Sequence, residues 1–460
     1  MYVSLRSSNK RRFTFTPAQV LALGFAGLIL LGSLLLWMPF VQEPGKSISY
    51  LDALFTAASS VCITGLVVVD ISSQFNIIGE LIVLALVQVG GLGIMTFSAL
   101  MFLLMGKRLT LRDRLVIKEA LGSFSIAGVV RLTRNIILTT LGIETVGVLL
   151  LTLAFAADMP LPSALYWGLF HGVSAFNNAG IALTSDSLHP FARDPLVLLL
   201  VGTLITVGGI GFFVLQDLWQ NWRRRECLSL HTRLVLRATL WFLIVGTLLV
   251  LVLEWSNPNT LGPLPWYHKI VNAWFMGLAP RSSGFETVST GSMLDATLLV
   301  TMVMMFIGAA PGGTGGGIKV TTFTLLLLVV RATASGADEI RVMGRRLARD
   351  LVDKALTVTV ISLSLVLTMA GLLLVSENAA LRDPTNPVGF INVLFEVVSA
   401  FGTVGLSTGM TASLSPLGRL LIVVTMFIGR VGPLTIATAL AQRKKTRTPL
   451  HYPEDRVMIG

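Results

Sequence analysis

Long apolar stretches, separated by short polar connections, constrain this chain more than any other feature of its sequence. Crossing a bilayer as a helix takes about 20 apolar residues. Eight stretches meet or approach that length: 17–40, 77–105, 136–157, 195–218, 234–255, 296–330, 356–375 and 417–440. Because 53% of the residues are hydrophobic and only 13% are charged, we expect an all-α integral membrane protein.

Basic residues indicate how the chain is oriented. Lys and Arg cluster in alternate connections, at 6–12, 107–134, 223–237, 331–354 and 443–456. The positive-inside rule therefore predicts a multi-pass membrane protein with both termini and the basic loops in the cytoplasm. The first stretch is too long for a secretory signal core and no small-residue cleavage site follows it, so we expect it to remain as a helix.

The formal net charge of +11 does not indicate nucleic-acid binding. Its confinement to one side of the membrane is explained by orientation and by contact with anionic membrane lipids. In this topology Cys62 and Cys227 lie on opposite sides of the membrane, so they cannot pair within one chain.

Four outer connections share one pattern, an apolar half-helix that ends in a small, polar, glycine-bearing turn. The segments are ALFTAASSVCITGL, GLFHGVSAFNNAGI, NAWFMGLAPRSSGF and VLFEVVSAFGTVGL. Aligned on the last glycine they give Gly65, Gly180, Gly284 and Gly405, with an aromatic residue ten positions earlier at Phe55, Phe170, Trp274 and Phe395. Spacings of roughly 105 to 120 residues indicate an internal repeat of one supersecondary unit.

Each unit is predicted to contain a membrane helix, a re-entrant half-helix with its returning loop, and a second membrane helix. The predicted units are 13–110, 128–222, 230–335 and 350–442, followed by a cytoplasmic C-terminal segment, 443–460. Re-entrant backbone is tolerated at membrane depth only where it is buried or lines a watery cavity. Eight membrane helices and four re-entrant loops in pseudo-symmetric units therefore predict one central pore.

The glycine turns are candidates for a cation filter. Glycine can adopt conformations that turn carbonyl oxygens inward, and Asn177 and Asn178 could hold their turn through side-chain hydrogen bonds to backbone. Such oxygens can replace the hydration shell of a potassium ion. The C-terminal ends of the half-helices carry partial negative charge, which also favours a cation. The predicted filter residues are Ile63, Thr64, Gly65, Asn177, Asn178, Ala179, Gly180, Ser282, Ser283, Gly284, Thr403, Val404 and Gly405. A single glycine would be only a packing residue, but the fourfold recurrence favours a filter.

The second long helix of the third unit contains FIGAAPGGTGGGIKVTT, residues 306–322. Its proline and glycines cannot sustain an α-helix, whereas the corresponding helices of the other units should at most bend. We interpret this segment as a gate below the filter, formed by Gly312, Gly313, Thr314, Gly315, Gly316, Gly317 and Lys319. A packing hinge without a transport role is the alternative. A phosphate-binding loop is excluded because Ile318 separates Gly317 from Lys319 and Val320 stands where Ser or Thr is needed.

Arg430 lies inside the last apolar stretch, and a charge there indicates a functional site. It could repel cations or donate hydrogen bonds to the glycine segment; an arginine satisfied by backbone carbonyls between helices is the alternative. Glu80 and Glu144 form no proton relay and are given no role. Neither metal-ligand spacing nor a nucleophile constellation surrounds the five histidines, so we predict no enzyme and no bound cofactor.

Taken together, SAFNNAG, TVGL, STGM, GGTGGGIKVTT and IGRVGPLT resemble the Trk/Ktr/HKT superfamily of potassium transporters, and most closely the bacterial Ktr-type membrane subunit. The resemblance covers almost the whole chain. It matches the family's filter glycines to Gly65, Gly180, Gly284 and Gly405, its gating loop to 310–319 and its gate arginine to Arg430. Plant relatives that prefer sodium carry Ser at the position of Gly65.

The resemblance also implies a homodimer on a cytoplasmic octameric ring of regulatory subunits that bind adenine nucleotides. Two features depart from the pattern: Cys62 and Ile63 in the first turn, and the pair Ser282 and Ser283 in the third. We predict potassium uptake across the bacterial inner membrane through the four-glycine filter. A sodium-selective or sodium-coupled transporter and a non-conducting scaffold or receptor are the alternatives.

Overall fold

The computed structural model describes residues 17–93, 129–224, 228–337, 339–380, 389–433 and 435. Within them nearly all regular structure is helical, apart from a hairpin in which β1 (Arg341–Val342) pairs antiparallel with β2 (Arg345–Arg346). Predictions for the connection 94–128, for Cys227 and for the segment 443–460 lie outside the described residues.

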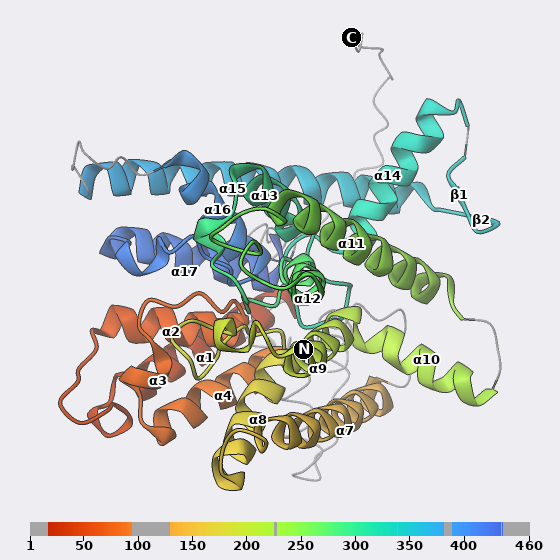
Figure 1. Cartoon of the computed structure of the whole chain (residues 1–460). Coiled ribbons are helices and arrows are strands. Elements are labelled where there is room, and N and C mark those ends of the chain that lie inside the picture. Colours follow the sequence, from red (N-terminus) through yellow and green to blue (C-terminus); the bar gives the residue numbers. More distant parts are fainter. Residues whose placement is uncertain are drawn as a thin grey trace, which may run out of the picture.

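Three kinds of helix recur along the described chain (Figure 1). Long first helices are α1 (Pro17–Trp37), α7 (Val129–Phe155), α11 (Leu230–Glu254) and α15 (Arg349–Ala380). Short inner helices are α2 (Tyr50–Cys62), α8 (Leu161–Phe176), α12 (Trp266–Leu278) and α16 (Phe390–Gly402). Second helices are α4 (Ile77–Leu92), α9 (Pro195–Ile210), α13 (Asp295–Phe306) and α17 (Pro416–Val431). Further helices are α3 (Ile71–Gln74), α10 (Phe212–Arg224) and α14 (Val320–Ala334).

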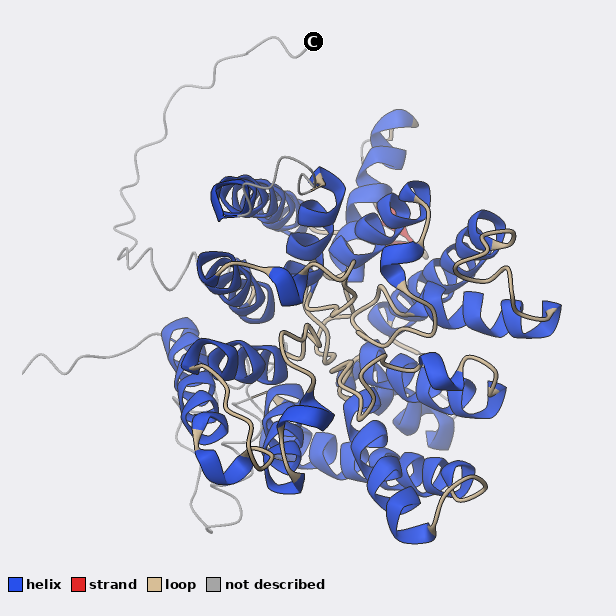
Figure 2. Cartoon of the chain, turned by 60° about the vertical axis from the view of Figure 1, so that its left-hand side comes forward, coloured by secondary structure: helices blue, strands red, loops and turns tan. Residues whose placement is uncertain are grey.

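The described helices are arranged as a closed ring. Each second helix contacts the next inner helix in the chain: α4 contacts α8, α9 contacts α12, and α13 contacts α16. The last second helix, α17, contacts the first inner helix, α2. Figure 1 shows the resulting order, with the blue α17 beside the red α1 and α2. An ion pair between Arg419 of α17 and Asp52 of α2 links the two ends of the ring. Loops gather at the centre and helices surround them (Figure 2).

The outer faces of the first helices are apolar and exposed. Leu153 of α7, Val252 of α11 and Val375 of α15 expose 69%, 74% and 71% of their surface. Large exposed apolar surface on a protein of this composition marks contact with lipid. By length and composition, four described helices could cross a membrane, namely α1, α7, α11 and α15, and the bent pair α9 and α10 would make a fifth.

The second helices differ from the sequence prediction. At 1.5 Å per residue, the 16 residues of α4, α9 and α17 and the 12 of α13 fall short of a hydrocarbon core of about 30 Å. None of these four helices alone reaches across such a core, and the ends of two predicted spans, 94–105 and 436–440, lie outside the described residues. The expectation that only the third unit is interrupted is wrong, because α9 and α10 meet at 94°. Gly211, with φ +99°, ends α9 there.

Candidate functional site

The four glycine turns share one backbone pattern. In each, the glycine and the residue two positions before it have positive φ: Ile63 and Gly65, Asn178 and Gly180, Ser282 and Gly284, Thr403 and Gly405. Positive φ is strained for β-branched side chains such as those of Ile63 and Thr403, and strain of this kind persists only where the surroundings enforce it. The recurrence therefore points to a required carbonyl arrangement rather than to turn-forming residues alone.

The four glycines approach one another closely. A Cβ atom on Gly65 would lie 3.3 Å from the Cα of Gly180, and one on Gly180 would lie 2.4 Å from the Cα of Gly284. A Cβ on Gly405 would lie 2.9 Å from the Cα of Gly284 and 3.0 Å from that of Gly65. These contacts close a ring of four turns in which only glycine fits.

A cavity of about 340 Å³ opens on one side of this ring. All four glycines line it, together with the segments that lead from each turn to the next helix. The two carboxylates on its wall are Asp70 and Glu286, and no Lys or Arg belongs to that described lining. The mouth thus favours cations.

A buried polar network lies behind the second turn. Asn177 Nδ2 donates to Glu144 Oε1 at 2.9 Å, to Gln88 Oε1 at 2.8 Å and to the carbonyl of Val173 at 2.9 Å. The predicted backbone bond of Asn177 is thus present. The Asn178 side chain makes no hydrogen bond among the described residues, so the prediction for it is wrong. Its tolerance of φ +58° is the property that suits the turn.

A buried carboxylate supports the fourth turn. Glu396 of α16 is fully buried and accepts hydrogen bonds from Ser407 Oγ at 2.6 Å, Thr408 N at 3.0 Å and Thr411 Oγ1 at 2.6 Å. These donors belong to the segment that follows Gly405. Glu396 therefore fixes the outer side of the turn to its own inner helix.

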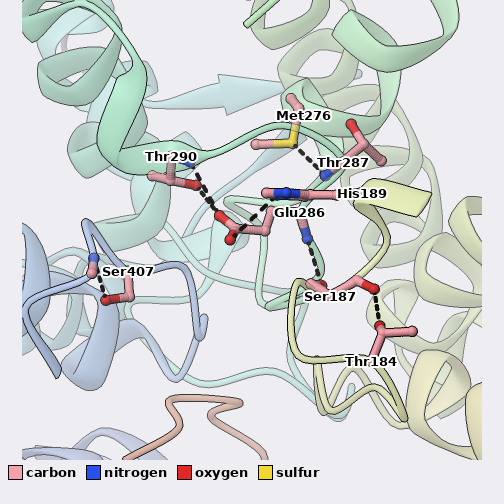
Figure 3. Close-up of polar contacts among 9 residues, drawn as sticks. Thr184, Ser187, His189, Met276, Glu286, Thr287, Thr290 and Ser407 are labelled. Atoms are coloured by element: carbon pink, nitrogen blue, oxygen red, sulfur yellow. Dashed lines mark hydrogen bonds and ion pairs between the residues drawn. The ribbon is translucent and has the colours of Figure 1, made fainter. Parts of the chain in front are cut away.

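The second and third turns are joined on the cavity side, as Figure 3 shows. Glu286 Oε1 lies 3.5 Å from His189 Nε2, and Glu286 Oε2 accepts a hydrogen bond of 2.6 Å from Thr290 Oγ1. The backbone N–H of Glu286 donates to Ser187 Oγ at 3.1 Å. The neighbouring carboxylate of Glu286 raises the pKa of His189 above its ordinary value, although partial burial opposes the rise.

The 307–319 loop between α13 and α14 packs against the opposite side of the ring from this cavity. Its Gly316 N–H donates to Thr403 Oγ1 at 2.9 Å, and a Cβ on Gly315 would lie 2.6 Å from Ser282 Oγ. The same loop is hydrogen-bonded to the broken second helix of the second unit, since Ala310 N donates to Gly209 O at 3.2 Å. The loop therefore touches the turns directly.

Two basic side chains hold this loop. Arg430 of α17 donates through Nη1 to the carbonyl of Thr314 and through Nη2 to that of Gly90, at 2.5 Å for the second. Lys319 Nζ donates to the carbonyl of Gly315 at 2.6 Å. The sequence prediction that Arg430 contacts the glycine segment agrees with this geometry, and so does the alternative that backbone carbonyls satisfy it.

The second helices share a glycine at one position, a recurrence that the sequence analysis interpreted only as bends in three of these helices. Counted from the start of each helix, Gly90, Gly208, Gly308 and Gly429 occupy one position. In three units a Cβ there would meet an inner-helix carbonyl, of Val61 at 2.2 Å, Phe176 at 1.9 Å or Phe401 at 2.0 Å. In the third, α13 has already ended and Gly308 meets Gly316 O of its own loop instead.

The units also differ three residues after these glycines. Gly93, Gly211 and Gly432 have φ of +77°, +99° and +93° and each ends a helix. The third unit carries Pro311 at this position, and proline cannot adopt positive φ. The backbone of the third unit therefore has to depart from that of the other units before Pro311.

The structure thus brings together all four predicted turns, packs the predicted gate segment 312–319 against the third and fourth of them, and binds Arg430 to that segment. It adds Thr403 and Ser282 as contacts of the loop, and Glu144 and Glu396 as supports of the turns. The one available sequence signal for Glu396 was a carboxylate inside the apolar inner segment VLFEVVSAFG.

Comparison with known proteins places this architecture in a family. A family model described as TrkH, cation transport protein, matches residues 7–447. The chain is 40% identical over 446 residues to Ktr system potassium uptake protein B of Bacillus subtilis, covering 97% of each. It is 35% identical over 450 residues to the potassium/sodium uptake protein NtpJ of Enterococcus hirae, covering 98% of each.

The fold is similar to the crystal structure of the potassium transporter TrkH from Vibrio parahaemolyticus, with a TM-score of 0.73 and 17% identity. The alignment covers 95% of this chain and 86% of that one. The chain belongs to the TrkH family of cation transport proteins, which are ion transporters and not enzymes.

Proposed function

We propose that this protein carries potassium into the cell through the ring formed by its four glycine turns. The observation that carries the proposal is the convergence of Gly65, Gly180, Gly284 and Gly405 on one cavity. Carbonyl oxygens of these turns would replace the hydration shell of a potassium ion, the transported substrate. The four units would surround this pore in a pseudo-symmetric arrangement, with α2, α8, α12 and α16 as its re-entrant helices.

Selectivity for potassium is supported by a glycine at every one of the four positions. The relatives named above include a Bacillus potassium uptake protein and an Enterococcus potassium/sodium uptake protein. The second name keeps sodium-selective or sodium-coupled transport as the alternative.

The 307–319 loop would act as the gate. It contacts the third and fourth turns, and Arg430 connects its Thr314 to Gly90 of the first unit. One guanidinium thus links the loop to two units, so releasing it would let the loop move without unfolding the surrounding helices. The name of the Ktr-system relatives supports a role as one component of a larger system. We further propose, from the resemblance of the sequence to the Ktr-type membrane subunit, that the other component is a cytoplasmic ring of regulatory subunits that bind adenine nucleotides.

The membrane subunit would be a homodimer in the bacterial inner membrane. Its basic connections, such as 331–354, would face the cytoplasm and the cavity beside His189 would face outward. No cofactor is required in this chain, because carbonyl oxygens and charges perform the selection.

Ion competition in vesicles tests the proposal. The purified protein in liposomes should take up rubidium, and external potassium should block this uptake at concentrations at which sodium does not. Sodium that blocks as well as potassium, or an absolute need for sodium, would favour the sodium alternative. Vesicles that take up no cation with the protein present, with or without the regulatory subunits, would contradict transport altogether.

A further inference from the structure

A groove between α11 and α14 lies outside the transport site. Its volume is about 1130 Å³. Leu234, Trp241 and Phe242 of α11 form one wall, and Phe323, Leu327 and Leu328 of α14 form the other. Trp241 exposes 53% of its surface and Leu327 48%, so the groove is open along the apolar face of the protein.

One end of this groove is basic. Arg331 lies in the last turn of α14, Arg341 lies in β1 shortly after it, and Arg237 lies in the first turns of α11. The carboxylate at this end belongs to Glu339, which pairs with Arg341 at 3.4 Å and with Arg346 at 2.9 Å. Arg237 and Arg331 have no ion-pair partner among the described residues.

We propose that this groove binds an anionic phospholipid, with an acyl chain between α11 and α14 and the phosphate at the arginines. The arrangement matches the ligand in both polarity and charge, since apolar walls lead to a cationic end. In the proposed topology that end faces the cytoplasmic leaflet, where anionic lipids are attracted to basic side chains. A soluble acidic partner would use the arginines but would have no use for the apolar walls.

The groove is also connected to the proposed gate. Phe242 and Phe323 have ring centroids 5.7 Å apart. They belong to the same apolar cluster as Ile307 and Ala310 of the 307–319 loop and Val320, the first residue of α14. On another side the Phe242 ring lies 5.9 Å from the guanidinium carbon of Arg281, next to Ser282 in the third turn. An occupied groove should therefore stabilise one position of α14 relative to α11, and with it one state of the loop.

Lipid retention measured by native mass spectrometry tests the binding directly. The full chain is incubated with phosphatidylglycerol or phosphatidylcholine, and retained lipid is compared with that of Arg237→Gln/Arg331→Gln. Because one arginine near a membrane surface contributes about fivefold to anionic-lipid binding, the double variant should lose roughly 25-fold in phosphatidylglycerol retention and little in phosphatidylcholine retention. Ala332→Trp, which fills the groove mouth and keeps both charges, should lose retention as well.

Arg345→Gln/Arg349→Gln is the matched control, because it removes the same charge from exposed positions that do not line the groove. It should retain phosphatidylglycerol like the parent protein. Equal losses in both double variants, or no loss in either, would overturn the proposal. Retention that resists Ala332→Trp but falls in the arginine variant would indicate an acidic partner or headgroup contact without the acyl site.

Flux supplies a second measurement, which rests on the proposed function. Rubidium uptake should differ between vesicles of phosphatidylcholine alone and vesicles that also contain phosphatidylglycerol, and Arg237→Gln/Arg331→Gln should remove the difference. A lipid effect that persists in this variant would overturn the coupling. Because native mass spectrometry needs no transport, absence of all flux would contradict the proposed function without touching the lipid site.

Discussion

The ring of turns lies next to the residues that end the second helices, yet the four units are alike in the ring and differ at the helix ends. At the ring all four units repeat one pair of positive φ values. At the ends of the second helices, the first, second and fourth units carry a glycine with positive φ, whereas the third unit carries Pro311. In the proposed function four turns surround one ion, which requires them to be equivalent, whereas a gate loop on the pore axis needs to come from only one unit.

We expect the largest effect on transport from a substitution that makes one of the four turns differ from the others. A side chain on Gly405, at φ +95°, would lie 2.1 Å from Thr64 O. Gly405→Ser should therefore reduce potassium uptake in liposomes to the level of empty vesicles. Gly409→Ser is the control, since Gly409 has φ +91° but no atom within 4 Å of an added Cβ. Equal uptake by the two variants would contradict the role of the ring.

Next in size is the loosening of the loop. Arg430→Ala removes the donors to Thr314 O and Gly90 O, so basal rubidium flux should rise several-fold and respond less to regulatory subunits. Deletion of 312–317 should act in the same direction. Arg430→Lys separates charge from geometry, because an ammonium cannot match the fork of a guanidinium. Basal flux that stays at the parent level in both Arg430→Ala and the deletion would remove the gate assignment.

A smaller effect should come from the break in the second unit. A side chain on Gly211, at φ +99°, would lie 2.7 Å from Pro311 O, so Gly211→Ala should displace the 307–319 loop and raise basal flux less than Arg430→Ala does. Gly93→Ala is the comparison, with φ +77° and open space around it among the described residues. A larger rise in Gly93→Ala would show that strain, rather than contact with the loop, decides the outcome.

The support behind the fourth turn should affect selectivity more than rate. Glu396→Gln keeps the size of the side chain but turns an amide NH₂ toward hydroxyl and N–H donors, at a cost of about 1–3 kcal/mol. The preference for potassium over sodium should fall several-fold, as measured by competition. Glu254→Gln is the matched control, because Glu254 accepts similar hydrogen bonds from Thr260 and Leu294 away from the turns. Unchanged selectivity in Glu396→Gln would assign its network to folding alone.

The smallest effect concerns the link between the second and third turns on the cavity side. Since Glu286 raises the pKa of His189 above 6.5, the unfolded value, the link contributes its full stability below that value. It loses this contribution as pH rises through the raised folded pKa. Thermal stability should therefore fall modestly over that window in the parent protein and not in His189→Gln. If stability changed with pH in the same way in both proteins, the contact between His189 and Glu286 would make no pH-dependent contribution to stability. The other acid near His189, Asp186, would then be tested by Asp186→Asn.

Much of the site followed from local sequence alone, because repetition reveals what a single motif does not. Four segments with a glycine ten residues after an aromatic residue predicted four equivalent turns, and Pro311 with its neighbouring glycines predicted a broken helix. The break at Gly211 was missed because glycines without a proline, such as the nearby Gly208 and Gly209, predict at most a bend in a membrane helix. The close approach of Gly211 to Pro311 O, which an added Cβ would meet at 2.7 Å, joins residues that are distant in sequence.

The sequence by itself determined the apolar helices, the internal repeat and the glycines of the turns, since these depend on hydrophobicity, periodicity and allowed backbone angles. Only the tertiary structure decided which turns meet, which carboxylates support them and which carbonyls Arg430 contacts. Those contacts join residues as far apart as Gly90 and Arg430, and such pairings arise from closing the ring rather than from any local preference of the chain.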